Sequence, residues 1–117
     1  MREFGAYIRE RRSRLNETDP RFSLRQVAAK IDVEPSYLSK VERGEQPPPS
    51  EQTIAELARV LGEDPDVLLA LAGKVSQDLR QIIMKRAKLF AELIREIRDL
   101  PDRAVLRLVR EVRDGNW

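Results

Sequence analysis

The sequence predicts an all-α protein, with five short helices followed by two C-terminal helices. Leu, Ile, Val, Ala, Arg and Glu are abundant and aromatic residues make up only 5% of the chain, which favours helix over sheet. Apolar residues recur at intervals of three and four along most of the 117 positions, as they do on one face of a helix. Gly and Pro residues divide these periodic segments into short elements.

Phe4 and Ile8 share one face of a first predicted helix, which covers residues 3–15. The following residues are rich in Asn, Asp and Pro, and they predict a loop. Ser23 and Gln26 have the spacing of a capping box, in which the hydroxyl accepts a backbone amide and the Gln side chain reaches back. A short second helix is therefore expected to begin at Ser23.

Pro35 suits the first turn of a third helix, and Gly44 is the residue type that commonly ends one. Ser50 is expected to cap a fourth helix that ends at Gly62. An Asp-Pro pair then begins a fifth helix that reaches Gly73.

The rest of the chain predicts two amphipathic helices. A longer helix is expected from Ser76 to about Asp99, with a length of ~36 Å at ~1.5 Å per residue. Pro101 breaks it, and a last helix follows over residues 102–113.

Composition excludes several classes of chemistry. The chain has no Cys and no His, so it can form no disulfide, no Cys/His zinc site, no thiol nucleophile and no imidazole acid or base. Its sequence has no Gly-rich phosphate loop and no nucleophile constellation. We therefore expect no enzymatic activity, no catalytic residues, no metal site and no cofactor.

A cytoplasmic protein without membrane contact is expected. No apolar run approaches the ~20 residues that a membrane-spanning helix needs. The first residues, MREFGAYIRERR, lack the apolar segment of a signal peptide.

Charge is unevenly distributed along the chain, although the net charge is only +2. Residues 1–43 carry a net charge of +3, residues 44–73 of −5, and residues 74–117 of +4. A basic segment beside an acidic one suits a protein that turns one face toward a polyanion.

The second and third helices have the dimensions of a helix-turn-helix, because both are short and only a few residues separate them. Ala28 is expected where the two helices cross, and Val33 is expected to anchor the turn in the core. Leu38 and Val41 would anchor the inner face of the third helix in the core. The residues left on its outer face are Ser36, Tyr37, Ser39 and Lys40.

The segment Phe22–Gly44 resembles the Cro/repressor-type, XRE-like family of DNA-binding regulators. The run SYLSKVERG carries most of the likeness, which continues in looser form through the fifth helix to Leu69. The resemblance implies a five-helix, repressor-like DNA-binding domain whose recognition helix opens at Pro35. It also implies that Glu42 pairs with Arg12 of the first helix.

The resemblance further implies which residues meet double-stranded DNA. Base-facing positions are Pro35, Ser36, Ser39 and Lys40. Positions at the sugar–phosphate backbone are Tyr37, Arg43, Ser23 and Arg25. Two departures stand out: Leu24 replaces a Gln that often touches phosphate, and Asp32 replaces the usual Gly of the turn.

The C-terminal helices carry a broad apolar stripe without a core of their own to join. Its dimerisation candidates are Leu79, Ile83, Phe90, Leu93, Ile94 and Ile97. Such a stripe suits burial across a two-fold axis, so we expect a homodimer. Packing on the N-terminal domain, or a site for an effector or partner protein, are the alternatives.

Together these observations predict two parts, a helix-turn-helix domain over residues 1–73 and a dimerising extension over residues 74–117. The expected function is a sequence-specific transcriptional regulator, most often a repressor in this family, that binds a palindromic operator as a dimer. The alternative is an antitoxin-like or adaptor protein whose C-terminal helices bind a partner protein.

Overall fold

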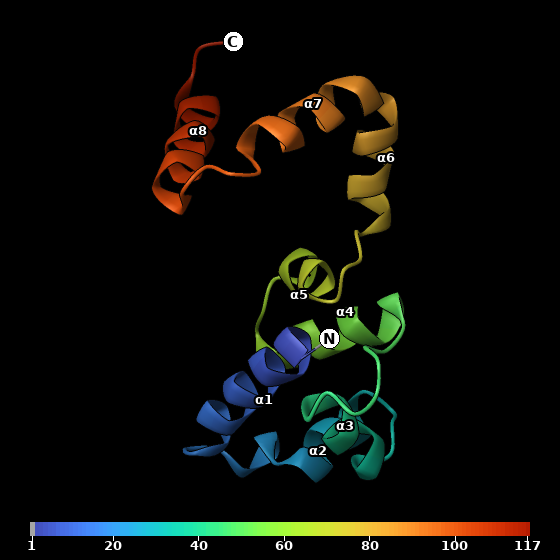
Figure 1. The fold of residues 1–117 in the computed structure, drawn as a ribbon. Coiled ribbons are helices and arrows are strands. Elements are labelled where there is room, and N and C mark those ends of the chain that lie inside the picture. Colours follow the sequence, from blue (N-terminus) through green and yellow to red (C-terminus); the bar gives the residue numbers. More distant parts are fainter. Residues whose placement is uncertain (1) are drawn as a thin grey trace. The chain divides into compact units, whose positions relative to one another are not determined.

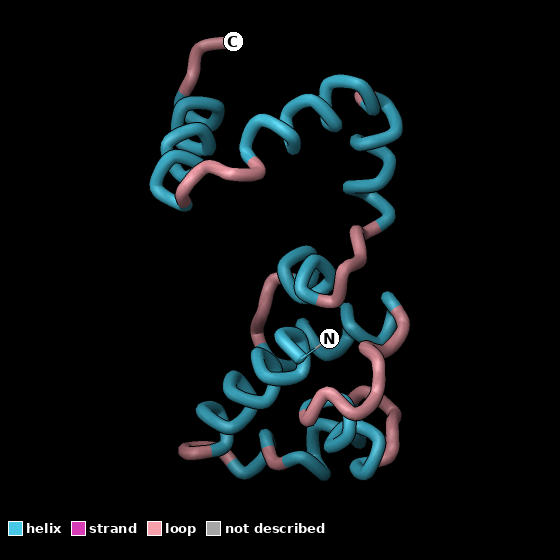
Figure 2. The backbone as a smooth tube through the Cα atoms, viewed as in Figure 1, coloured by secondary structure: helices cyan, strands magenta, loops and turns pink. Residues whose placement is uncertain are grey.

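The structure is a computed structural model that describes residues 2–117, and every regular element in this part of the chain is helical (Figures 1 and 2). The predicted all-α class is therefore confirmed. In chain order the elements are α1 (Arg2–Asn16), the short 3-10 helix η1 (Pro20–Phe22), α2 (Leu24–Lys30), α3 (Pro35–Glu42), α4 (Glu51–Leu61), α5 (Pro65–Leu71), α6 (Gln77–Lys85), α7 (Ala87–Ile97) and α8 (Asp102–Asp114).

The chain forms two compact units, an N-terminal unit that ends at Gln77 and a C-terminal unit of residues 78–117. Within the described residues, no helix combines the length and the apolar character that crossing a membrane requires.

The helices of the N-terminal unit begin where the capping residues predict. The Ser23 hydroxyl accepts the backbone N–H of Gln26 at 3.2 Å, which caps α2. The Ser50 hydroxyl accepts the N–H of Thr53 at 3.3 Å and caps α4 in the same way. At the start of α5, the Asp64 carboxylate accepts a backbone N–H two residues later at 2.9 Å. Each side chain satisfies an amide that has no partner inside the helix.

Left-handed residues follow several of the short helices, and Gly62 and Asp32 are two of them. Gly62, which follows α4, has a φ of 69°, a conformation that costs glycine little because it has no Cβ. Asp32, in the turn after α2, has a φ of 58° and is the one non-glycine residue with positive φ among the described residues. Asp tolerates this region better than most residues, so it can replace the Gly that the turn usually carries.

One hydrophobic core joins the five helices of the N-terminal unit. Helix α1 crosses α3 so closely that a Cβ added to the buried Gly5 would lie 2.8 Å from the backbone oxygen of Glu42. The buried apolar residues are Phe4, Ile8, Val27, Ala28, Ile31, Leu38, Val41, Ile54, Leu57, Ala58, Leu61, Leu68, Leu69 and Ala72. Leu15, Phe22, Val33 and Tyr37 pack against this core from its edges. The unit therefore closes a core of its own.

The prediction of one long helix from Ser76 to Asp99 is wrong. The chain forms α6 and α7 instead, and the break lies at Arg86, whose φ of −127° and ψ of 42° are not helical. No described side chain of α6 or α7 is buried. Most helical stability comes from packing an apolar face, and without that burial little keeps the backbone helical through Arg86. The extension thus has three helices rather than two.

Candidate nucleic-acid interface

Helices α2 and α3 and the turn between them form the central motif of the N-terminal unit. Ala28 is fully buried, so α3 approaches α2 over a side chain with a single methyl group. In the turn, the backbone N–H of Val33 donates to the carbonyl of Ala28 at 3.0 Å. Val33 packs against the core, as predicted. Leu38 and Val41 are buried below α3. The motif therefore has the geometry of a helix-turn-helix.

A buried ion pair holds α3 against α1. The guanidinium of Arg12 donates to both carboxylate oxygens of Glu42, at 2.7 Å and 3.0 Å. It also donates to the backbone oxygen of Phe22 at 3.2 Å, which links the segment just before α2 to the same ion pair. The exposed fractions of the two side chains are only 11% and 4%. The pair implied by the resemblance is therefore present, and it positions the last turn of α3.

The outward side of α3 carries small and basic residues. Ser36 and Lys40 are exposed, and Pro35 and Ser39 are half-buried at the edge of this face. Tyr37 differs from the expectation of an outward side chain, because it is half-buried and packs against the core. It lies one residue before the buried Leu38, and part of its side chain contacts the core while the rest stays accessible.

At the end of α3, Arg43 is held by two neighbours. Its Nη1 donates to the Ser39 hydroxyl at 2.6 Å, while Nε and Nη2 donate to the Glu45 carboxylate at 3.1 Å and 3.0 Å. These hydrogen bonds lower the pKa of the Glu45 carboxyl, and the charge of Lys40 lowers it further. Glu45 is not among the residues that the sequence predicted for this interface. Its acidic side chain follows the predicted phosphate-binding Arg43 by two residues, and this close spacing of opposite charges could have indicated an ion pair.

The predicted phosphate contacts at the start of α2 are only partly free for DNA. The Ser23 hydroxyl already accepts the Gln26 amide, and Arg25 is exposed. Before them, the Arg21 guanidinium donates to Asp19, with a shortest distance of 2.7 Å. This hydrogen bond lowers the pKa of the Asp19 carboxyl from 3.8 to about 2. Asp19 also caps η1 by accepting the N–H of Arg21.

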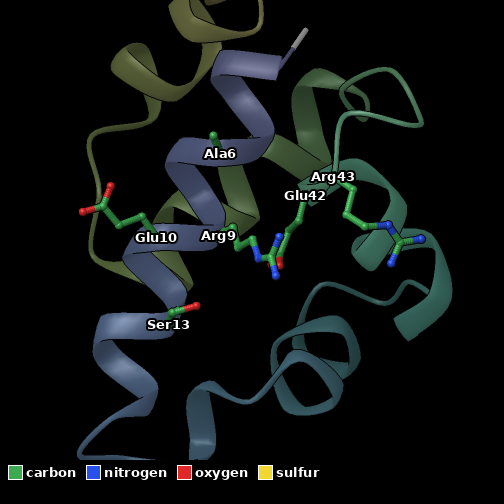
Figure 3. Close-up of a pocket in the computed structure, with 6 residues that line it drawn as sticks. All are labelled: Ala6, Arg9, Glu10, Ser13, Glu42 and Arg43. Atoms are coloured by element: carbon green, nitrogen blue, oxygen red, sulfur yellow. The ribbon is translucent and has the colours of Figure 1, made fainter.

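An open hollow of about 520 Å³ lies between α1 and the end of α3. Its lining residues are Ala6, Arg9, Glu10, Ser13, Glu42 and Arg43. Figure 3 shows that the Arg9 side chain reaches from α1 toward Glu42, whereas Arg43 extends away from it. Charges of both signs line this hollow. Across the described residues, no three Asp or Glu side chains gather closely enough to hold a metal ion.

The predicted dimerisation residues lie in α6 and α7 of the C-terminal unit. Leu93 and Ile94 are exposed to 54% and 44%, and Ile83 and Ile97 are half-buried. Leu79 and Phe90 are each 37% exposed. Two of the six also line an apolar groove of about 370 Å³ with α8. Its residues are Leu93, Ile97, Val105, Leu108, Val109, Val112 and Arg113.

Comparison with known families agrees with this geometry. Residues 3–71 match the family described as helix-turn-helix domain, and this match covers more than half of the chain. The chain therefore belongs to this family, and its N-terminal unit is a DNA-binding domain of the helix-turn-helix class. No curated protein and no solved structure matches the chain. The family match ends before α6.

Proposed function

We propose that the protein is a sequence-specific transcriptional regulator, a repressor, that binds double-stranded DNA in the cytoplasm. The observation that carries this proposal is the α2–turn–α3 motif, in which Arg12 and Glu42 fix α3 while Ser36 and Lys40 remain exposed. A helix of this kind fits the major groove and reaches base edges with its early residues.

In this proposal, one group of residues contacts the bases and another contacts the sugar–phosphate backbone. Base-reading positions are Pro35, Ser36, Ser39 and Lys40. Backbone positions are Ser23, Arg25, Tyr37 and Arg43. A lysine can donate to guanine, and short hydroxyls can donate or accept, so α3 offers both specific and permissive contacts. Contacts to phosphate set the register and make the affinity dependent on salt.

The second part of the proposal is a homodimer that places two copies of α3 on a palindromic operator. The apolar groove between α7 and α8 supports it, because large apolar patches on a protein surface usually mark an interface. A second copy is the occupant we assign, since a two-fold interface buries the same apolar face on both chains. Half-sites about 34 Å apart would then face the same side of the duplex.

The test combines sedimentation equilibrium with DNA titration at fixed salt. Full-length protein should be a dimer at micromolar concentration and should select symmetric half-sites from a random DNA pool. Leu93→Asp with Val109→Asp should produce a monomer, and its operator affinity should fall roughly 100-fold or more as the coupling of two half-sites is lost. Leu106→Asp is the control, because Leu106 is equally exposed on α8 but does not line the groove.

The same groove carries the second candidate function, an antitoxin-like or adaptor protein that binds a partner protein with its C-terminal helices. A full-length chain that is monomeric, and whose DNA affinity the Leu93 and Val109 changes leave intact, would favour this alternative. If the chain shows no salt-dependent binding to any DNA, the proposal that it is a DNA-binding regulator is wrong.

A further inference from the structure

The end of α3 contains a second charged cluster that the helix-turn-helix motif does not require. Glu45 takes both the Nε and the Nη2 hydrogen bonds of Arg43, and Ser39 takes the Nη1 hydrogen bond. Arg43 is a backbone-contacting residue in the proposed function, and Ser39 is a base-reading residue. Glu45 therefore holds the proposed backbone-contacting Arg43 directly, and Arg43 in turn holds the proposed base-reading Ser39.

The geometry of this pair resembles the geometry that a phosphate would use. Nε and Nη2 form one edge of the guanidinium, and an acid with two oxygens binds that edge through parallel hydrogen bonds. The Glu45 oxygens occupy it at 3.1 Å and 3.0 Å. A DNA phosphate that approaches the same edge has to replace the carboxylate.

The pair is accessible to such an exchange. The exposed fractions of the Arg43 and Glu45 side chains are 45% and 56%, in contrast to the buried pair of Arg12 and Glu42. Ion pairs this exposed are weak in water. A DNA phosphate can therefore compete, while the Glu45 charge, close to Lys40 as well, opposes every phosphate that reaches this end of α3.

From these contacts we infer that Glu45 is an affinity-limiting residue of the DNA interface: its carboxylate competes with the DNA backbone for the guanidinium of Arg43. This inference rests on the proposed DNA-binding function. Because phosphate contacts supply nearly all sequence-independent affinity, Glu45 restrains above all the binding of random DNA. It acts through Arg43, and it is a positioning residue rather than a base-reading one.

The experiment measures the affinity of the full chain for a random-sequence duplex over a range of salt concentrations. Glu45→Gln keeps the shape of the side chain and removes its charge. It should raise the affinity by roughly 3- to 10-fold, and it should steepen the dependence of log affinity on log salt by up to about 0.9. Thermal melts of the parent and the variant should coincide, because the pair is exposed.

A double-mutant cycle separates this competition from a general effect of charge. In an Arg43→Gln background, Glu45→Gln should bring little or no gain, because the guanidinium for which Glu45 competes is absent. Glu111→Gln is the matched control, since Glu111 forms an exposed pair with Arg107 in α8 and the substitution changes the net charge by the same amount. It should alter the affinity by less than about twofold.

Three results would overturn the inference, and they are distinguishable. No gain in Glu45→Gln would show that the carboxylate does not compete with phosphate. An equal gain with and without Arg43 would reduce Glu45 to a long-range repulsive charge. If the parent protein itself shows no salt-dependent binding, then the proposed function fails and the inference fails with it.

Discussion

The N-terminal and C-terminal units are both built from amphipathic helices, but they differ in what becomes of the apolar faces. The first five helices bury their stripes in one core that includes Phe4, Leu57 and Leu68. Helices α6, α7 and α8 have no buried side chain among the described residues, although apolar and polar residues are sharply segregated in α7 and α8. Amphipathic spacing therefore predicts that a helix forms, and it does not predict what covers the helix.

The two units differ in their ion pairs as well. In the N-terminal unit, Arg12 and Glu42 are enclosed between α1 and α3. In α8, Arg107 and Glu111 pair at 3.2 Å, with exposed fractions of 82% and 61%. Burial decides how much each pair contributes to the stability of the fold, because a buried charge that loses its partner cannot be hydrated instead.

Removing Arg12 is the change with the largest expected effect. Arg12→Ala leaves the Glu42 carboxylate buried without a partner and should lower the free energy of unfolding by ~3–5 kcal/mol. Arg107→Ala removes the same residue type from the exposed pair, and its melt should match that of the parent. Chemical denaturation of both variants tests the contrast. Equal stability of Arg12→Ala and the parent would contradict the structural role of the pair.

Truncating one leucine in each unit tests the difference in burial directly. Leu57 is 1% exposed, so Leu57→Ala should lower the free energy of unfolding by ~2–5 kcal/mol through lost burial and a new cavity. Leu106 is 54% exposed, and Leu106→Ala should have little effect. The measurement is the denaturation midpoint of each variant. A comparable loss from both would mean that α8 is packed far more tightly than its exposure indicates.

Lys40 and Lys88 test which unit reads DNA. Lys40→Ala removes an exposed donor from α3 and should weaken binding to a selected operator by ~1–3 kcal/mol, with relaxed preference at one base pair per half-site. Lys88→Ala, in α7, should change neither the affinity nor the preference. Titrations with the operator and with single-base variants measure both. If Lys40→Ala weakens binding to every sequence equally, then Lys40 contacts phosphate rather than a base.

The smallest expected effect concerns the exposed loop before α2. Arg21 lowers the pKa of Asp19 to about 2, so the ionised carboxylate stabilises the fold above pH ~4, and this contribution is lost as the pH falls toward 2. Asp19→Asn keeps an oxygen that can cap η1 and removes the charge. The variant should melt slightly below the parent at pH 7, and the gap should close near pH 2. A gap independent of pH would mean that the ion pair contributes nothing.

Local signals explain why most of the N-terminal unit was predictable. Ser23, Ser50 and Gly62 act on amides and carbonyls within a few residues of themselves, so the sequence reveals these helix boundaries. The pairing of Arg12 with Glu42 joins residues thirty positions apart, and only the resemblance to a known family implied it. The break at Arg86 escaped prediction because no Gly or Pro marks it and the apolar spacing continues through it.

By itself, the sequence determined the helical class, the starts of α2 to α5 and the short helix-turn-helix with its buried Leu38 and Val41. These features depend on capping and on spacing of a few residues, which are local properties of the chain. Tertiary structure decided that Tyr37 packs partly against the core, that Arg12 meets Glu42 thirty positions away, and that α6 to α8 gain no buried side chain. The physical reason is that burial and long-range side-chain contacts depend on which distant surfaces meet. The apolar period of a helix predicts that it has an apolar face, but not which surface covers that face.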